Sequence, residues 1–308
     1  MSQLRRGYLF GIAAYTCWGL FPLYWKLLRP ATPVEILAHR IIWSLVVVLG
    51  IIAVTNGWRS LARLARTPAK LGLIALAAVV IAINWGTYIY GVNADRVVET
   101  SLGYFINPLV TVALGVLVLR ERLRSAQWVA LAIGAAAVGV LTLDYGHIPY
   151  LALTLAFSFG LYGLIKKRLA VPAADGLLVE SAVLALPALV YLGVLTAHGE
   201  STFGQVSGVH TALLVLAGLV TAIPLLLFAG AANRIPLSAI GLLQYLAPIL
   251  QLACGVLVYS EPMPAARLAG FALVWLALAV FTWDGVRHAR IQSRSPSRSA
   301  VPLNVGAA

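Results

Sequence analysis

Three ionisable side chains interrupt long apolar stretches of the sequence, and they are the first candidates for moving a proton or a charged ligand. His39 and Arg40 are neighbours in one stretch, and Glu180 lies near the start of another. Ionisable groups are costly in hydrocarbon and by default mark a transport pathway. His39 titrates near physiological pH, which suits proton coupling. Arg40 requires a partner or water at such a depth.

Each of these side chains also has a purely structural interpretation. A single membrane histidine can hydrogen-bond between helices, and Arg40 lies close enough to the start of its stretch to reach the lipid headgroups. Glu180 can face the cytoplasmic headgroups beside the basic run at 166–168. The functional hypothesis instead pairs Glu180 with Arg40 or His39, in a contact that is made and broken during transport.

Pro108 and Pro248 interrupt two further apolar stretches and predict helix kinks. Because proline has no N–H, each frees the backbone carbonyl four residues earlier. Free carbonyls at membrane depth are tolerated where they are buried in protein or line a wet cavity. Kinks that only assist packing are the alternative. The polar and aromatic neighbours of the two prolines form a candidate lining: Tyr104, Asn107, Gln244 and Tyr245.

The first and third apolar stretches add Trp18, Asn84 and Trp85 to the candidates. Both tryptophans fall well inside their stretches, where an indole ring can stack on a planar or cationic substrate. Packing in the core is the alternative for each of them.

Motifs for catalysis or nucleotide binding are missing from the sequence. It contains no Walker loop, GxGxxG or GxSxG, and its five histidines lack metal-ligand spacing. Both cysteines lie inside apolar runs and are typical of packing residues. We therefore expect no catalytic residue, no cofactor and no metal, and no ATP-driven pump.

The composition requires a lipid environment for the elements that position these residues. Of 308 residues, 61% are hydrophobic and only 10% are charged, against about 25% charged in soluble domains. This excludes a soluble enzyme, a disordered chain and a secreted disulfide scaffold. Ten apolar runs predict ten transmembrane helices, although counting alone also allows nine or eleven. The runs are 7–26, 36–54, 71–91, 101–119, 126–143, 148–165, 177–196, 211–231, 238–258 and 266–283.

The positive charges support an even number of spans. With the amino end in the cytoplasm, 17 of the 22 Lys and Arg fall in cytoplasmic segments, as the bias of these residues toward cytoplasmic loops demands. Both termini, residues 1–6 and a basic tail at 284–308, are then cytoplasmic, and the tail is expected to be disordered. The net charge of +12 is an orientation signal, and no nucleic-acid partner is expected.

An internal repeat divides the chain into two units, 7–143 and 148–283. A shift of 140 residues aligns 102–121 with 242–261, and the run at 115–118 recurs letter for letter at 255–258. With one further residue of shift, Glu180 falls on His39. Because five spans, an odd number, separate matching positions, the two five-helix units must be inverted relative to each other. Inverted repeats are typical of secondary transporters with a site near the midplane.

Four segments, 36–44, 99–109, 156–163 and 244–248, resemble the RarD-type branch of the EamA family in the drug/metabolite transporter superfamily. The resemblance extends from the first helix to the tenth. It implies an EamA-like fold of two inverted units in a bacterial inner membrane, and export or exchange of a small molecule.

The leading functional hypothesis is a secondary transporter that exports a metabolite or drug-like compound through one central site by alternating access, driven by a proton gradient or by substrate exchange. A membrane enzyme or lipid-handling protein that uses the same cavity is the alternative, and a non-transporting sensor is a third. The expected partners are the small-molecule substrate, protons and the lipid bilayer. The sequence leaves the oligomeric state open.

Overall fold

The computed structural model describes residues 3–55, 58, 64, 66–120, 123–169, 171, 173–235 and 237–294, and within these residues it contains helices and no strand. The first part of the chain forms α1 (Gln3–Gly19), α2 (Phe21–Leu27), α3 (Pro33–Thr55), α5 (Pro68–Asn93), α6 (Val97–Leu119) and α7 (Ser125–Tyr145). The second part forms α8 (Tyr150–Leu169), α9 (Ala173–Ala197), α10 (Gly208–Ala232), α11 (Leu237–Leu243), α12 (Leu246–Ala253), the π-helical η1 (Cys254–Val258) and α13 (Ala265–Arg294).

Seven of these helices are long and apolar enough to cross a membrane: α3, α5, α6, α7, α9, α10 and α13. Shorter apolar helices cover 150–166 and 246–258. The all-helical class and the membrane character expected from the composition are confirmed. The remaining three expected spans, 7–26, 148–165 and 238–258, correspond to helices that are broken or shorter.

Two of these spans, 7–26 and 238–258, are each divided into two helices beside a proline. The first divides at Leu20, between α1 and α2, and Pro22 lies in the first turn of α2. The other divides at Gln244 and Tyr245, and Pro248 lies in the first turn of α12. Proline suits the first turn because its missing N–H has no acceptor there. Pro108, in contrast, lies inside α6, which continues through it.

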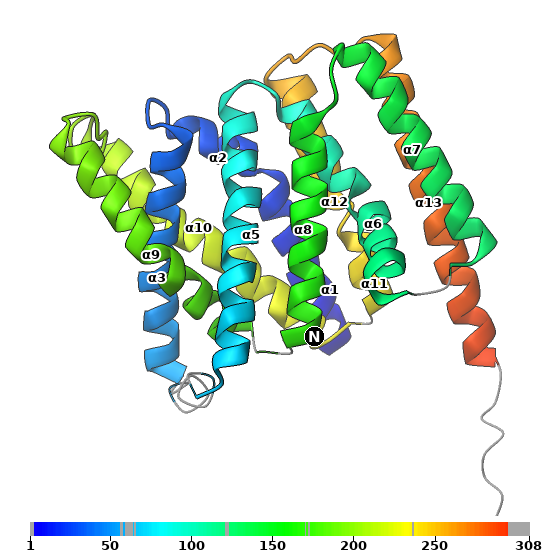
Figure 1. Ribbon diagram of the computed structural model, residues 1–308, viewed down its shortest axis with the longest axis horizontal. Helices are drawn as coiled ribbons and strands as arrows, with labels where there is room; N and C mark the ends of the chain where they lie inside the picture. The colour runs from blue at the N-terminus through cyan, green and yellow to red at the C-terminus, as the bar shows by residue number, and fades with distance from the viewer. Residues whose placement is uncertain are drawn as a thin grey trace, which may run out of the picture.

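The helices pack against one another in pairs (Figure 1). The pair α7–α13 lies at one side of the molecule, and α3 packs on α9. Between them, α6 packs on α8 and α12, α5 packs on α8 and α9, and α10 packs on α1 and α3. The crossings are close where small residues face a neighbour: a Cβ on Gly218 of α10 would lie 2.5 Å from the backbone oxygen of Trp43 in α3. Close approach through glycine is typical of helices packed in a membrane.

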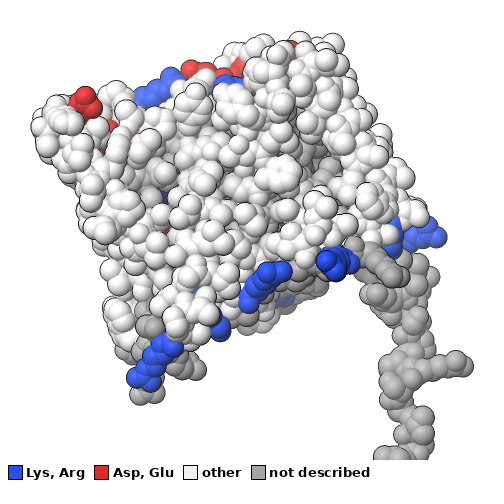
Figure 2. All heavy atoms as spheres, in the orientation of Figure 1, with Lys and Arg blue, Asp and Glu red and all other residues white. Residues whose placement is uncertain are grey.

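The two edges of the molecule differ in charge (Figure 2). Lys and Arg appear along the lower edge without visible acidic neighbours, whereas acidic and basic residues alternate along the upper edge. The start of α1 and the end of α13 both lie at the lower edge (Figure 1).

The region after 283 differs from the expected tail. α13 continues to Arg294, so the first part of the 284–308 segment is helical; residues 295–308 lie outside the described part of the chain. The physical reason is an ion pair from Asp284, which is buried, to Arg124 at the start of α7. This contact holds α13 against α7 beyond the apolar run.

Candidate functional site

Arg40 of α3 is buried at mid-depth in the helix bundle, with 4% of its surface exposed. Its Nε donates a hydrogen bond of 2.9 Å to Oγ1 of Thr221, close to the centre of α10. The Thr221 hydroxyl in turn donates to the backbone oxygen of Ala217. α10 therefore holds the guanidinium of Arg40 inside the bundle, which disagrees with the snorkelling interpretation.

Aromatic rings surround the Arg40 guanidinium. Its Cζ lies 3.9 Å from the ring centre of Trp85 in α5, 5.1 Å from that of Trp25 and 5.9 Å from that of Phe21, both in α2. The negative faces of aromatic rings attract a cation, most strongly when water is excluded. We call Arg40, Thr221, Trp85, Trp25 and Phe21 the Arg40 site.

An amide and two tyrosines adjoin the Arg40 site. Asn84, one residue before Trp85, donates to Ser158 Oγ at 3.0 Å and to the backbone oxygen of Leu155 at 2.9 Å in α8. The Tyr104 hydroxyl of α6 lies 3.4 Å from Asn84 Oδ1, and its ring meets that of Tyr88 edge-on. The hydroxyls of both tyrosines lie within electrostatic range of Arg40. Helices α3, α5, α6, α8 and α10 thus converge here.

His39, although it neighbours Arg40 in the sequence, faces elsewhere. Its ring stacks on Phe203 with centroids 4.8 Å apart, and it lines a half-open cavity of about 230 Å³ between α3, α9 and the loop that follows α9. Its Nε2 is buried without a hydrogen-bond partner among the described residues. His39 is therefore placed to contact the 198–207 loop and not the Arg40 site.

Glu35, one turn before His39, anchors that loop. Its Oε1 accepts hydrogen bonds from the Thr202 amide at 2.7 Å and from the Ser201 hydroxyl at 3.2 Å. The His210 ring at the start of α10 lies 2.9 Å from Thr202 Oγ1. These contacts hold Phe203 over His39.

Glu180 of α9 is buried, and its partners lie on α8. Lys166 Nζ lies 2.8 Å from Glu180 Oε1, and the Tyr162 hydroxyl donates to Oε2 at 3.1 Å. The expected pairing of Glu180 with Arg40 or His39 is absent from this structure, in which Lys166 neutralises the carboxylate. The placement of Glu180 near Lys166 agrees with the structural alternative.

The other candidates are spread over the bundle. Trp18 meets Tyr15 and Phe228 edge-on or tilted, and its backbone oxygen accepts from Gln251 at 3.1 Å. Gln244 and Tyr245 form the break before α12. Asn107 has a buried Oδ1 without a partner in the described part. Among the described residues, no hydrogen bond, ion pair or cation–π contact joins any of these to Arg40.

The structure thus brings together Arg40, Asn84, Trp85 and Tyr104 and leaves the other candidates apart. Sequence reasoning missed Thr221, Trp25, Phe21 and Tyr88. Trp25 could have been found through the repeat, because a shift of 141 residues places it on Lys166. No signal singled out Thr221, since hydroxyls are common in apolar helices.

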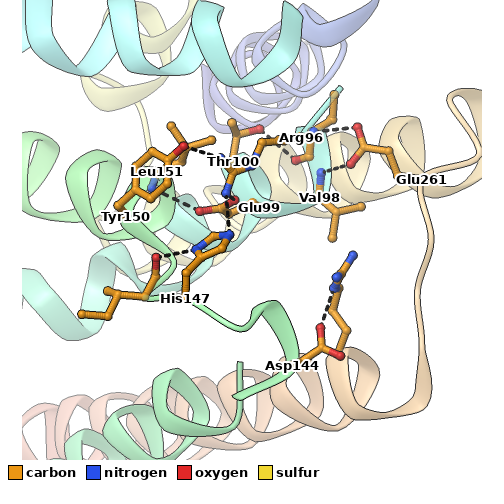
Figure 3. A network of polar contacts seen from close by, with 12 residues as sticks. Arg96, Val98, Glu99, Thr100, Asp144, His147, Tyr150, Leu151 and Glu261 are labelled. Atoms are coloured by element: carbon orange, nitrogen blue, oxygen red, sulfur yellow. Dashed lines mark hydrogen bonds and ion pairs between the residues drawn. The ribbon is translucent and has the colours of Figure 1, made fainter. Parts of the chain in front are cut away.

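A network of polar contacts surrounds the start of α6 (Figure 3). Arg96 forms an ion pair with Glu99 and contacts Tyr150 and His147. Glu99 Oε1 accepts from the Leu151 amide at 3.1 Å. This network ties the start of α6 to the start of α8.

Two further carboxylates lie near the start of α6. Glu261 accepts the first amides of α6, from Val97 at 2.7 Å and Val98 at 2.8 Å, and burial raises the pKa of this carboxyl. Asp95 accepts a hydrogen bond from Lys26, which lowers the pKa of Asp95, although 61% of its side chain is exposed. Both carboxylates hold helix ends and loops, outside the Arg40 site.

Comparison with known proteins gives a consistent assignment. The EamA-like transporter family matches residues 5–143. "Protein RarD" of Streptomyces exfoliatus is 54% identical over 98% of this chain and 95% of its own length. "Uncharacterized transporter YojE" of Bacillus subtilis (strain 168) is 45% identical over 94% of this chain and 97% of its own length.

A solved crystal structure shares the fold, with a TM-score of 0.57 at 20% identity, over 91% of this chain and 98% of that chain. Several relatives are named as transporters, which agrees with the expectation that this protein is not an enzyme. The chain belongs to the RarD proteins of the EamA-like transporter family, within the drug/metabolite transporter superfamily.

Proposed function

We propose that this transporter exports a small molecule across the cytoplasmic membrane by alternating access, with the Arg40 site as the substrate site. The proposal includes ten transmembrane helices in two inverted units, 7–143 and 148–283, and both termini in the cytoplasm. In alternating access the two units rock around a fixed site near the midplane.

The observation that carries the proposal is a symmetry in the helix contacts. When each helix is replaced by its repeat equivalent in the other unit, several observed helix pairs become other observed pairs. The exchange replaces α1–α2 by α8, α3 by α9, α5 by α10, α6 by α11–α12 and α7 by α13. It converts the α1–α10 contact into α5–α8, the α3–α10 contact into α5–α9, and the α6–α8 contact into α1–α12, all of which occur. The contacts α3–α9, α6–α12 and α7–α13 convert into themselves. A pseudo-twofold relation between the units explains this pattern.

Side chains support the same relation. A shift of 141 residues places Phe21 and Trp25, which face Arg40, on Tyr162 and Lys166, which face Glu180. Each unit therefore places these matched first-helix positions against an ionisable side chain of its own second helix. The orientation draws support from the Lys- and Arg-rich lower edge, where the described ends of the chain also lie (Figure 2).

We assign proton coupling to Glu180. Its pair with Lys166 joins α8 to α9, and both helices pack against helices of the first unit, contacts that must change if the units rock. Protonation of the carboxylate would release Lys166, and a ligand or proton shifts a conformational equilibrium only through different affinities for the two states.

Transport is tested by flux into proteoliposomes that contain the purified protein, with a metabolite panel and imposed pH gradients. We expect saturable flux of at least one compound, driven by the gradient in the wild type and independent of the gradient in Glu180→Gln. Saturable binding without flux would contradict transport, and flux that ignores the gradient in the wild type would remove the coupling.

Orientation is tested with single cysteines in a background without Cys17 and Cys254. A membrane-impermeant maleimide should label Gln205→Cys in intact cells and Ser125→Cys only after permeabilisation. Both positions are exposed, so the two variants control for reactivity. The reverse labelling pattern would overturn the orientation.

A further inference from the structure

The Arg40 site holds more hydrogen-bond donors than acceptors. Nε is the one guanidinium atom of Arg40 with an acceptor among the described residues, which leaves Nη1 and Nη2 with four N–H groups. The Tyr88 hydroxyl and the Trp25 indole Nε1 are also buried without a partner in that part of the chain. Buried polar groups in native proteins almost always have partners, so a concentration of unused donors requires an explanation.

The charge of Arg40 is also uncompensated. No carboxylate of the described residues forms an ion pair with Arg40. At the upper edge of the molecule, in contrast, Lys26, Arg96 and Arg267 each form an ion pair with a carboxylate. In the second unit, by contrast, the buried carboxylate of Glu180 is paired with Lys166. The guanidinium of Arg40 has no such counter-charge among the described residues.

We propose that Arg40 binds the carboxylate of the transported molecule, which makes the substrate an organic monoanion. This inference rests on the proposed function, since it names the substrate class for the same site. The planar fork of Nη1 and Nη2 matches the two oxygens of a carboxylate. The Tyr88 hydroxyl is the second donor, and a single guanidinium balances a single negative charge.

The aromatic rings account for the strength of such a site. Trp85 and Trp25 hold the guanidinium in place and exclude water, so its orientation does not depend on the ligand. A charged hydrogen bond is stronger in this environment than in water. Thr221 accepts the hydrogen bond of Nε, which leaves the N–H groups of Nη1 and Nη2 for a ligand.

The test compares acids with their own amides on the purified full-length protein in detergent. Acetate, benzoate and phenylacetate are each measured beside acetamide, benzamide and phenylacetamide, with sodium chloride at matched ionic strength, by ligand-dependent thermal stabilisation. We expect at least one acid to raise the midpoint of unfolding in a saturable manner while its amide does not. If no acid exceeds its amide, the proposal is overturned.

Two variants locate the effect. Tyr88→Phe removes one hydroxyl and keeps the ring, so it should fold and weaken acid binding by about tenfold, as expected for loss of a hydrogen bond to a charged group. Tyr90→Phe, at an exposed tyrosine of the same helix, is the matched control and should bind as the wild type does. Arg40→Gln should abolish the stabilisation. Acid binding that survives both Tyr88→Phe and Arg40→Gln would overturn the proposal.

Flux separates this inference from the proposed function. If the protein binds the acid but does not carry it or any other compound, the anion site stands and transport fails. If the protein carries neutral or cationic compounds and no acid exceeds its amide, transport stands and the anion site is overturned.

Discussion

The pair between Lys166 and Glu180 gives the most decisive test of the energetics. Replacing Lys166 by Met leaves a carboxylate with 2% exposure beside an apolar side chain. At the observed 2.8 Å, the attraction in a medium of effective dielectric constant 20 is about 6 kcal/mol. Desolvation of both groups offsets much of this, so breaking one buried pair costs about 3–5 kcal/mol. Because 23% of the Lys166 side chain is exposed, we expect about 3 kcal/mol.

A double-mutant cycle isolates this energy from the rest of the site. Glu180→Gln leaves Lys166 able to turn toward water and keeps an acceptor for Tyr162, so it should cost about 1 kcal/mol. If the two changes were independent, the double variant would lose the sum of the two single losses. We expect its loss to be about 2 kcal/mol smaller than that sum. The free energy of unfolding is measured by titration with sodium dodecyl sulfate and followed by tryptophan fluorescence.

The matched control is the pair between Arg267 and Asp144, at 2.9 Å and similarly buried. Arg267→Met should reduce stability by a similar amount, which calibrates the method with a second buried pair. If Lys166→Met and Glu180→Gln are additive within about 0.5 kcal/mol, the pair does not act as an energetic unit and the argument fails.

Three further changes test the packing and the edges. Gly218→Ala should lower the free energy of unfolding by about 1–3 kcal/mol, because its Cβ would overlap the backbone of α3, whereas Gly193→Ala meets open space and should be neutral in the same titration. Glu261→Gln keeps one of two acceptor oxygens and should cost about 1 kcal/mol, visible as faster hydrogen exchange in the first turn of α6; unchanged exchange would contradict the cap. The pKa of Asp95 lies below its ordinary 3.8 in the folded protein, so its stabilisation is complete above that value and is lost as the pH falls through the lower, folded value. The midpoint of thermal unfolding should therefore fall less steeply below about pH 4 in Asp95→Asn, and parallel curves would contradict this.

The membrane character was predictable from composition, but the partners of the ionisable residues were not. Successive residues on an α-helix point about 100° apart, so His39 and Arg40 face different neighbours although they are adjacent. The sequence does not give the rotation of α3 about its axis, and that rotation decides which of the two enters the bundle. Asn84 and Trp85 were predicted candidates that do converge with Arg40, because α5 packs beside α3 and α8.

The repeat had unequal predictive value. It aligns Trp25 with Lys166, and these two side chains contact Arg40 of α3 and Glu180 of α9 respectively. It did not reveal that Glu180 finds its partner within its own unit, because alignment of two halves says nothing about which contacts cross between them. The two prolines illustrate the same limit: α6 continues through Pro108, whereas a break precedes Pro248.

The Glu261 cap on α6 has a consequence for the order of synthesis. The first turn of α6 is completed by a carboxylate that lies more than 160 residues later in the chain, and Gln251 likewise completes a bond to Trp18 in α1. While the ribosome is still producing the second unit, these partners do not yet exist. The start of α6 and the α1 contact therefore reach their final packing only after the segment that contains Gln251 and Glu261 has been made, so the early and late parts of the chain mature together.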